Sequence, residues 1–209
     1  EPFEGNDITV YELPSPIQMN INKIEGFIAQ WEYFQTIFVA AMGSPAVQTV
    51  GVDTMTLCYK NKCDAYLEEV NVKSDGGRKQ LLQIEYGRPN EGIRTIYQYA
   101  KAIGKNLVVT HHLRDHYVQV MKNGSLESVS DGTLETDGMR DTARYVDVSL
   151  RNTKTKGELR STFIKCGLNL DKEGTDIKNA TWDRVMNMME IGWHGPAFPR
   201  RKQEEPSDN

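Results

Sequence analysis

The sequence predicts an α/β fold in which a mainly parallel sheet is flanked by helices and antiparallel strands are added late in the chain. Short apolar runs that alternate with helical periodicity predict the parallel part. Two of these runs, residues 46–53 and 106–111, stop on polar side chains, as strands do at the carboxyl edge of a parallel sheet. Residues 145–170 instead predict successive strands joined by a basic turn.

The first half of the chain is predicted to alternate strands with helices. Residues 8–13 form a short strand, which the following Pro14 ends because proline cannot continue the ladder. Residues 22–42 carry apolar side chains at spacings of three and four, the pattern of one buried helix face. Residues 46–53 are the next strand and residues 55–70 the next helix.

The second half is predicted to change from this alternation to strands and turns. Residues 114–141 are rich in Gly, Asp and Ser and contain two turn signals, Asn123-Gly124 and Asp131-Gly132, so we expect a hairpin or a mobile loop there. The other expected elements are a helix over 90–103, strands over 106–111, 145–150, 159–166 and 168–170, and a short helix over 181–189.

Length and composition favour one domain, with an expected core over residues 1–192 and a charged tail over 193–209. The longest apolar run, residues 37–42, is too short to cross a bilayer, and the acidic N-terminus does not resemble a signal peptide. Three cysteines without paired spacing predict reduced thiols and a cytoplasmic location, that of the host cell if the protein is viral. The net charge of −4 means that nucleic-acid binding would need a local basic patch or an assembly.

Asp53 is the first candidate for chemistry, because it ends the apolar run Val50-Gly51-Val52 at the edge where ligands bind in open α/β folds. A carboxylate there can hold Mg²⁺, often through water, with the hydroxyl of Thr54 beside it. The same residue types also cap helices, so Asp53 is equally suited to begin the helix that follows.

The polar residues that follow the next parallel strand are the second candidate. Thr110 or His111 at this position can hydrogen-bond a γ-phosphate and report its loss. His111, His112, Asp115 and His116 also form a compact cluster of metal-ligand types suited to Zn²⁺, Mn²⁺ or Fe²⁺, although their spacing matches no helical metal motif. A polar loop after a strand is the remaining interpretation.

Two further candidates are charged. Glu12 ends the first expected strand, where a carboxylate one strand away from Asp53 can orient an attacking water, and a solvated strand end is the alternative. Lys165 lies in an otherwise apolar run among several cations that suit a neighbouring subunit's nucleotide, nucleic-acid phosphates or a solvated hairpin face. These cations are Arg144, Arg151, Lys154, Lys156, Arg160 and Lys165.

The order of these motifs resembles the RecA-like P-loop ATPase domain of phage recombination proteins and of related phage nucleotide-binding proteins. The resembling segments span residues 8–189, and their combination and order carry the resemblance. They include Thr49 to Thr56, Tyr86-Gly87, Lys105 to His112, Ala143 to Val148, and Phe163 to Cys166.

The resemblance implies an ATPase that binds ATP and Mg²⁺ and acts in DNA recombination or on single-stranded DNA, as a homo-oligomer. Asp53 then corresponds to the Walker B aspartate, and Thr110 and His111 stand where the family senses the γ-phosphate. Glu12 matches the acidic residue that activates water, and Lys165 falls where some members place a basic residue that acts on a neighbouring subunit.

One feature of that family is missing from the sequence. There is no G-x-x-x-x-G-K-[ST] phosphate loop, which in the family precedes the strand that Glu12 would end. Because the chain also begins without Met, we expect a fragment that binds ATP poorly by itself. Two alternatives to an ATPase are a catalytically inactive assembly module on the same fold and a metal-dependent hydrolase built on the His/Asp cluster.

Overall fold

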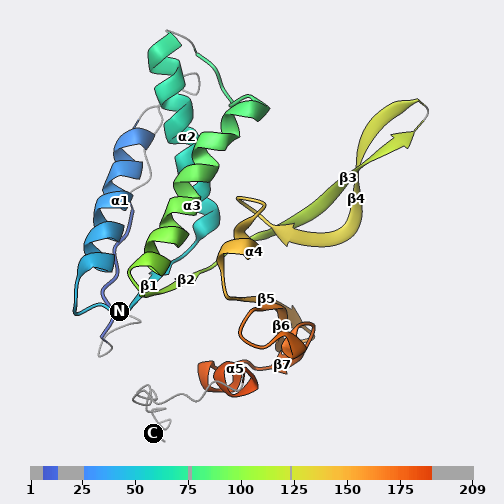
Figure 1. The fold of residues 1–209 in the computed structure, drawn as a ribbon. Helices are drawn as coiled ribbons and strands as arrows, with labels where there is room; N and C mark the ends of the chain where they lie inside the picture. Colours follow the sequence, from blue (N-terminus) through green and yellow to red (C-terminus); the bar gives the residue numbers. More distant parts are fainter. Residues whose placement is uncertain (1–6, 14–25, 75–76, 123, 190–209) are drawn as a thin grey trace, which may run out of the picture. The chain divides into compact units, whose positions relative to one another are not determined.

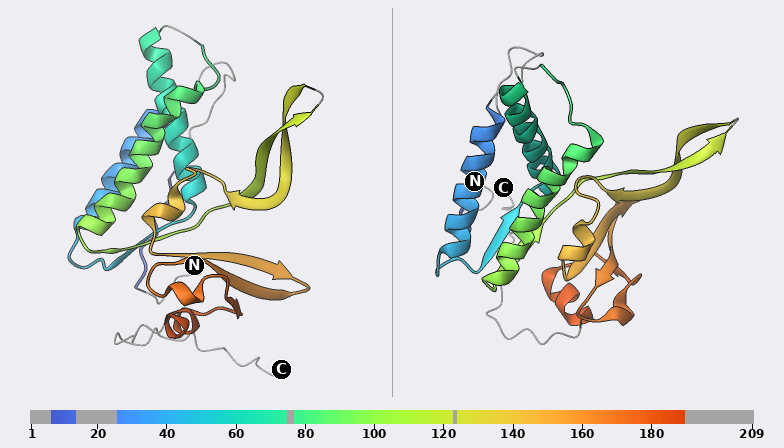
Figure 2. Two further views of the ribbon diagram at one scale, coloured as in Figure 1. Left: turned by 45° about the vertical axis from the view of Figure 1, so that its right-hand side comes forward. Right: turned by 45° about the horizontal axis from the view of Figure 1, so that its top comes forward.

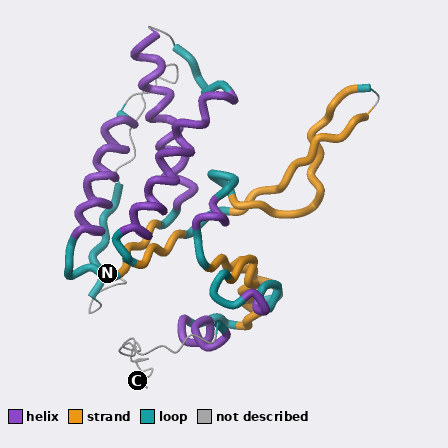
Figure 3. The backbone as a smooth tube through the Cα atoms, viewed as in Figure 1, coloured by secondary structure: helices purple, strands orange, loops and turns teal. Residues whose placement is uncertain are grey.

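The computed structural model describes residues 7–13, 26–74, 77–122 and 124–189. The chain divides into two compact units, Glu1–Tyr145 and Val146–Asn209, and each contains helices and a small sheet, so a mixed α/β fold is confirmed. The described strands form one parallel pair, one antiparallel hairpin and one three-stranded antiparallel sheet (Figures 1 and 3). None of the described helices is long and apolar enough to span a membrane. The predicted boundary after residue 192 lies outside the described residues.

Helix α1, Phe27–Gly43, buries one face through side chains at spacings of three and four. Trp31, Phe34 and Phe38 follow one another along this face with ring centroids 5.4 and 5.8 Å apart. Phe38 also lies 6.3 Å from Tyr99 of helix α3, a separation at which aromatic rings attract each other. The helix predicted over 22–42 is confirmed from Phe27 onward, and its first residues belong to the part that the structure leaves undescribed.

The first turn of α1 is capped by a carboxylate from another helix. Gly26 precedes α1 with a φ of 84° and offers no side chain, so the free N–H groups of the first turn need a different acceptor. Glu68 of helix α2, Met55–Ser74, accepts hydrogen bonds from the N–H groups of Gly26, Phe27 and Ile28 at 3.0, 2.7 and 3.0 Å. The negative charge also suits the positive end of the helix dipole, so α2 fixes where α1 begins.

Strands β1, Thr49–Val52, and β2, Asn106–Val109, pair in parallel. They are connected by α2, the short 3-10 helix η1, Gln83–Tyr86, and α3, Gly87–Ala102. Helix α1 packs against α2 and α2 against α3, and the three helices run side by side (Figures 1 and 2). The predicted strands over 46–53 and 106–111 and the predicted helices over 55–70 and 90–103 are therefore confirmed as β1, β2, α2 and α3, with shifted ends. Alternate residues of β1 and β2 are partly buried, as expected for strands with one covered face.

Residues 8–13 form no strand, so the predicted first strand is wrong. Ile8, Val10 and Tyr11 are 54, 56 and 60% exposed. The alternation of apolar and polar side chains over residues 8–13 favours a strand locally. A strand also requires a hydrogen-bonded neighbour, and the described part of the chain supplies none for this segment. Glu12 therefore lies on an exposed, irregular segment.

Strands β3, Leu113–Lys122, and β4, Ser125–Thr136, form an antiparallel hairpin that extends away from the helices (Figures 1 and 2). The predicted hairpin is thus confirmed, and Gly124, with a φ of 83°, occupies its turn. Gly132 makes no second turn. It lies within β4 where the register with β3 shifts, and its φ of 78° suits such a bulge. A single-turn helix α4, Thr142–Tyr145, follows.

The second unit is an antiparallel sheet in the order β5-β6-β7, formed by Val148–Thr155, Glu158–Cys166 and Asp176–Lys178. Helix α5, Trp182–Met188, completes it. Its buried core consists of Phe163, Cys166, Ile177, Val185, Met186 and Met189.

The strand predicted over 168–170 is wrong. The side chain of Asn169 accepts the N–H of Asp171 at 3.3 Å, which favours a turn over a ladder, and the 3-10 helix η2 occupies Leu170–Lys172.

All three cysteines are free thiols. Burial raises the pKa of Cys58 to about 12 and that of Cys63 to about 11. Both side chains therefore stay protonated at neutral pH, and Cys166 is fully buried.

Replacing Glu68 with Ala should leave the first turn of α1 without its acceptor. We expect a loss of about 1.5–3 kcal/mol of local stability, the range for hydrogen bonds to a charged group, seen as faster amide hydrogen exchange in the first turn of α1. Glu69→Ala is the matched control, since Glu69 is the neighbouring acid of α2 and its ion pair with Lys73 is long, at 4.0 Å. Unchanged exchange in Glu68→Ala would show that the cap is unimportant.

Candidate functional site

Asp53 and Thr110 lie side by side where β1 and β2 end. The N–H of Thr110 donates to the carbonyl of Val52 at 3.1 Å, the ladder bond of the last register pair, Val52 with Val109, and the N–H of Met55 donates to the Thr110 carbonyl at 2.8 Å. The hydroxyl of Thr110 donates to the carboxylate of Asp53. Because parallel strands end at the same edge of a sheet, these two side chains share that edge, as the sequence predicts.

The carboxylate of Asp53 is not used to cap the helix that follows. Helix α2 begins at Met55, and the hydroxyl of Thr54 accepts the N–H of Leu57 at 3.3 Å, the geometry of an N-cap. The capping role that the sequence allowed for Asp53 therefore belongs to Thr54. Asp53 is exposed, and the hydrogen bond described for it is the one from Thr110, so it can hold a hydrated cation.

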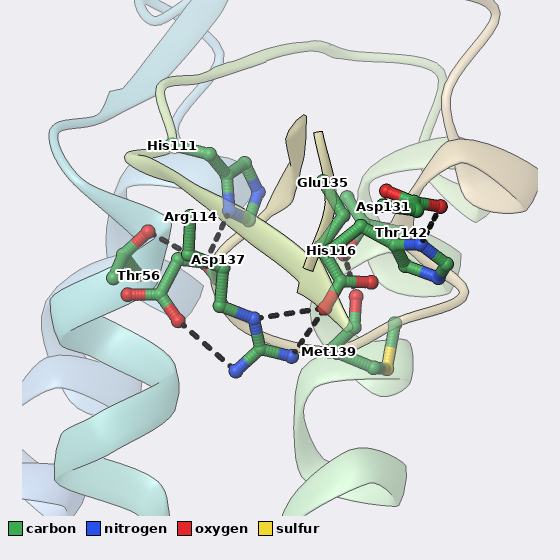
Figure 4. A network of polar contacts seen from close by, with 9 residues as sticks. All are labelled: Thr56, His111, Arg114, His116, Asp131, Glu135, Asp137, Met139 and Thr142. Carbon is green, nitrogen blue, oxygen red and sulfur yellow. Dashed lines mark hydrogen bonds and ion pairs between the residues drawn. The ribbon is translucent and has the colours of Figure 1, made fainter. Parts of the chain in front are cut away.

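A buried hydroxyl ties the strand ends to the base of the hairpin (Figure 4). Thr56 is 7% exposed, donates to the carbonyl of Asp137 at 2.7 Å and accepts the N–H of His112 at 3.0 Å. It thereby satisfies one backbone group after β2 and one after β4. Both segments are held at the start of α2, two to three residues beyond Asp53 and Thr110.

The imidazole of His111 is held on both of its nitrogens. Nδ1 lies 3.3 Å from the carbonyl of Asp137, and Nε2 lies 3.4 Å from the hydroxyl of Tyr97 on α3. Because a carbonyl can only accept, Nδ1 carries the proton and Nε2 accepts from Tyr97. Burial lowers the pKa of His111, which favours the neutral ring. Of the two predicted phosphate sensors, it is Thr110 that contacts Asp53.

An ion-pair network closes the base of the hairpin (Figure 4). Arg114 donates from Nε to Glu135 at 3.0 Å and from Nη1 to the carboxylate of Asp137 at 3.5 Å. Arg114 and Glu135 are direct cross-strand partners, a position where opposite charges stabilise a sheet. No motif in the sequence marks Arg114, Tyr97 or Asp137 as part of this site, and no sequence signal marks the hydrogen bonds of Thr56.

The His/Asp cluster does not assemble as a metal centre within the described residues. His116 Nδ1 lies 2.7 Å from the carboxylate of Asp131 on the opposite strand. Hydrogen bonds from Thr133, and then from His116, lower the pKa of Asp131 to about 2. Over the described ranges, no three His, Cys, Asp or Glu side chains gather in a way that could hold a metal ion.

The structure thus brings together Asp53, Thr54 and Thr110, with His111 next along the chain. Glu12 lies on the exposed segment over residues 7–13. Lys165 lies in β6 of the second unit, where its Nζ donates to the carbonyl of Val146 at 2.7 Å.

Comparison with protein-family models, with curated proteins and with solved structures finds no match for this chain. Any function assigned to it therefore rests on the sequence motifs and on the geometry at the ends of β1 and β2.

Replacing Thr56 with Val should remove both of its hydrogen bonds while keeping its shape. The N–H of His112 and the carbonyl of Asp137 would lose their partner, so we expect the free energy of unfolding in urea to fall by about 1–3 kcal/mol. Thr56→Ser keeps the hydroxyl and should cost less. Equal stability of the Val variant and the wild type would exclude Thr56 as a clamp.

His111 should make stability depend on pH. Its pKa is lowered in the folded state, so the unfolded chain binds more protons as the pH falls. The stability that the neutral ring contributes is complete above the unfolded pKa of about 6.5 and is lost as the pH falls through the lower folded value. Urea unfolding at several pH values across this window should show a shallower dependence in His111→Gln than in the wild type. The same slope in His111→Gln and in the wild type would contradict this role.

Proposed function

We propose that this chain forms the magnesium-binding and phosphate-sensing side of a RecA-like ATPase that acts in phage DNA recombination or on single-stranded DNA. The pairing of Asp53 with Thr110 at the carboxyl ends of two parallel strands carries the proposal. Open α/β sheets bind ligands at this edge, and phosphoryl-transfer sites place there a carboxylate for the metal and a side chain that responds to the γ-phosphate.

Each residue of the pair has a defined role in this proposal. Asp53 holds Mg²⁺ directly or through water, with Thr54 beside it. The single hydroxyl proton of Thr110 is donated to Asp53 in the described structure. With a cation held at that carboxylate, the hydroxyl of Thr110 would be free to turn towards the γ-phosphate of ATP instead. The roles expected for Glu12 in activating water and for Lys165 in acting on a neighbouring subunit of a homo-oligomer stay predictions.

The presence or absence of a phosphate loop distinguishes the proposed ATPase from a catalytically inactive assembly module on the same fold. Its backbone N–H groups and lysine supply much of the grip on ATP, and the sequence from Glu1 to Asn209 contains no such motif. The gene sequence directly upstream of the codon for Glu1 is therefore decisive. A G-x-x-x-x-G-K-[ST] motif there supports the ATPase, and the product of an open reading frame without one should not bind ATP.

Mg²⁺-dependent ATP hydrolysis by the product of the complete reading frame tests the role of Asp53. Asp53→Asn keeps the shape of the side chain and removes its charge, so we expect turnover to fall about 100-fold or more, the scale on which a group that stabilises developing charge acts. Thr110→Val should also lower turnover, because it removes the hydroxyl without changing the size of the side chain.

Asp115→Asn is the matched control, because Asp115 is also an exposed aspartate and lies in β3 outside the pair. It should retain wild-type turnover. Unchanged hydrolysis in Asp53→Asn would overturn the proposal, and an equal loss of turnover in Asp115→Asn would show that the effect is not specific to the pair.

A further inference from the structure

The β5–β6 hairpin of the second unit extends beyond the part of the sheet where β7 pairs with β6. Strand β7 pairs with β6 only at Arg160, Ser161 and Thr162. On the side towards the turn, one further backbone hydrogen bond joins the N–H of Asn179 to the carbonyl of Leu159. The remaining residues up to the turn form a two-stranded ribbon that projects past β7 and α5 (Figure 2). We call residues 152–157 the hairpin tip.

The hairpin tip is basic in a chain that is acidic overall. Residues 151–160 contain four cationic side chains and one acidic side chain, whereas the whole chain has a net charge of −4. The one acid, Glu158, contacts Lys178 at 3.0 Å and Arg160 at 2.9 Å, and these two cations lower its pKa. Its charge is therefore compensated within the sheet and does not neutralise the tip.

Lys154 and Lys156 carry the uncompensated charge of the hairpin tip. Both are exposed, and neither has an ion-pair partner among the described residues. The β3–β4 hairpin is different, because its charged side chains pair across the strands, as in Arg114 with Glu135 and Lys122 with Glu127. Two exposed lysines without ion-pair partners among the described residues therefore form a local positive surface on this ribbon.

The chemistry of the hairpin tip identifies the partner that it fits. Its residues are Asn152, Thr153, Lys154, Thr155, Lys156 and Gly157. Lysine, threonine and asparagine side chains are the types that contact phosphate and sugar in nucleic-acid complexes. The tip has no aromatic side chain on which a base could stack and no apolar side chain that could enter a membrane or anchor a protein interface. A shallow depression of about 390 Å³ beside it is lined by Thr155, Lys156, Glu158 and Arg160.

We propose that the hairpin tip binds the phosphate backbone of a nucleic acid through Lys154 and Lys156, without selecting bases. The proposal deepens the function proposed above by naming a nucleic-acid contact, and it rests on that function for its biological setting but not for its test. It also explains how a chain with a net negative charge can bind a polyanion, because the attraction is local.

Fluorescence anisotropy of a labelled oligothymidylate, titrated with the protein in the absence of nucleotide, tests the hairpin tip. The variant combines Lys154→Gln with Lys156→Asn, because Lys156 has a φ of 51° and asparagine tolerates this conformation. We expect affinity at ~0.1 M salt to fall about ten-fold or more, and the slope of log K against log salt to become shallower by about 1.4, or ~0.7 for each lost phosphate contact.

Three controls separate charge from folding and from general effects. Lys154→Arg with Lys156→Arg should bind as the wild type does, since the charge is kept. Lys79→Gln with Lys101→Gln removes two exposed lysines from the first unit and should leave affinity unchanged. A labelled duplex should lose affinity in parallel with the single strand, because the contact is to the backbone.

The proposal is overturned if the Gln/Asn variant keeps both the affinity and the salt slope of the wild type. Failure of the wild type to bind the oligonucleotide also overturns it, as does hairpin-dependent binding to phosphatidylserine vesicles but not to the oligonucleotide. Binding is measured without ATP, so a failed ATPase test leaves this result standing, and failed DNA binding leaves the assignment of Asp53 standing.

Discussion

The parallel pairing of β1 with β2 is the constraint on which the first unit depends. It joins two strands separated by two long helices, and parallel strands require such a crossover. The register places Val52 opposite Val109, and Asp53 and Thr110 meet although 57 residues separate them. A slip of one residue would turn the side chains of one strand to the other face and would separate this pair. The start of α2, with its clamp to the hairpin, is built on the same register.

The fold was predictable from the sequence where local periodicity decides the structure. Helix α1 follows from the spacing of Trp31, Phe34 and Phe38, and the β3–β4 hairpin follows from the turn signal Asn123-Gly124. Prediction failed where the secondary structure depends on which groups are available as hydrogen-bond partners. Residues 8–13 alternate well but find no neighbouring strand among the described residues, and Asn169 turns the chain away from a ladder by bonding to its own backbone.

The candidate site likewise contains some residues that could be predicted from the sequence and others that could not. Asp53 and Thr110 were predictable because the carboxyl ends of parallel strands meet, which is a property of topology and needs no knowledge of side-chain packing. Thr56 was not predictable as a clamp, because its acceptor lies 81 residues further along the chain and has no sequence signature. Tyr97 is similar, since only the packed helix α3 brings its hydroxyl to His111. Long-range hydrogen bonds of this kind depend on the assembled fold and leave almost no trace in local sequence.

The burial of the native thiols has a practical consequence. Cys58 and Cys63 hold their protons far above neutral pH, and Cys166 is shielded in the core of the second unit. Maleimides and other thiolate-selective reagents should therefore react slowly with the native protein. A single cysteine introduced at a solvent-facing position would then be alkylated first, so a fluorophore or spin label can be attached to one chosen place without first removing the natural cysteines.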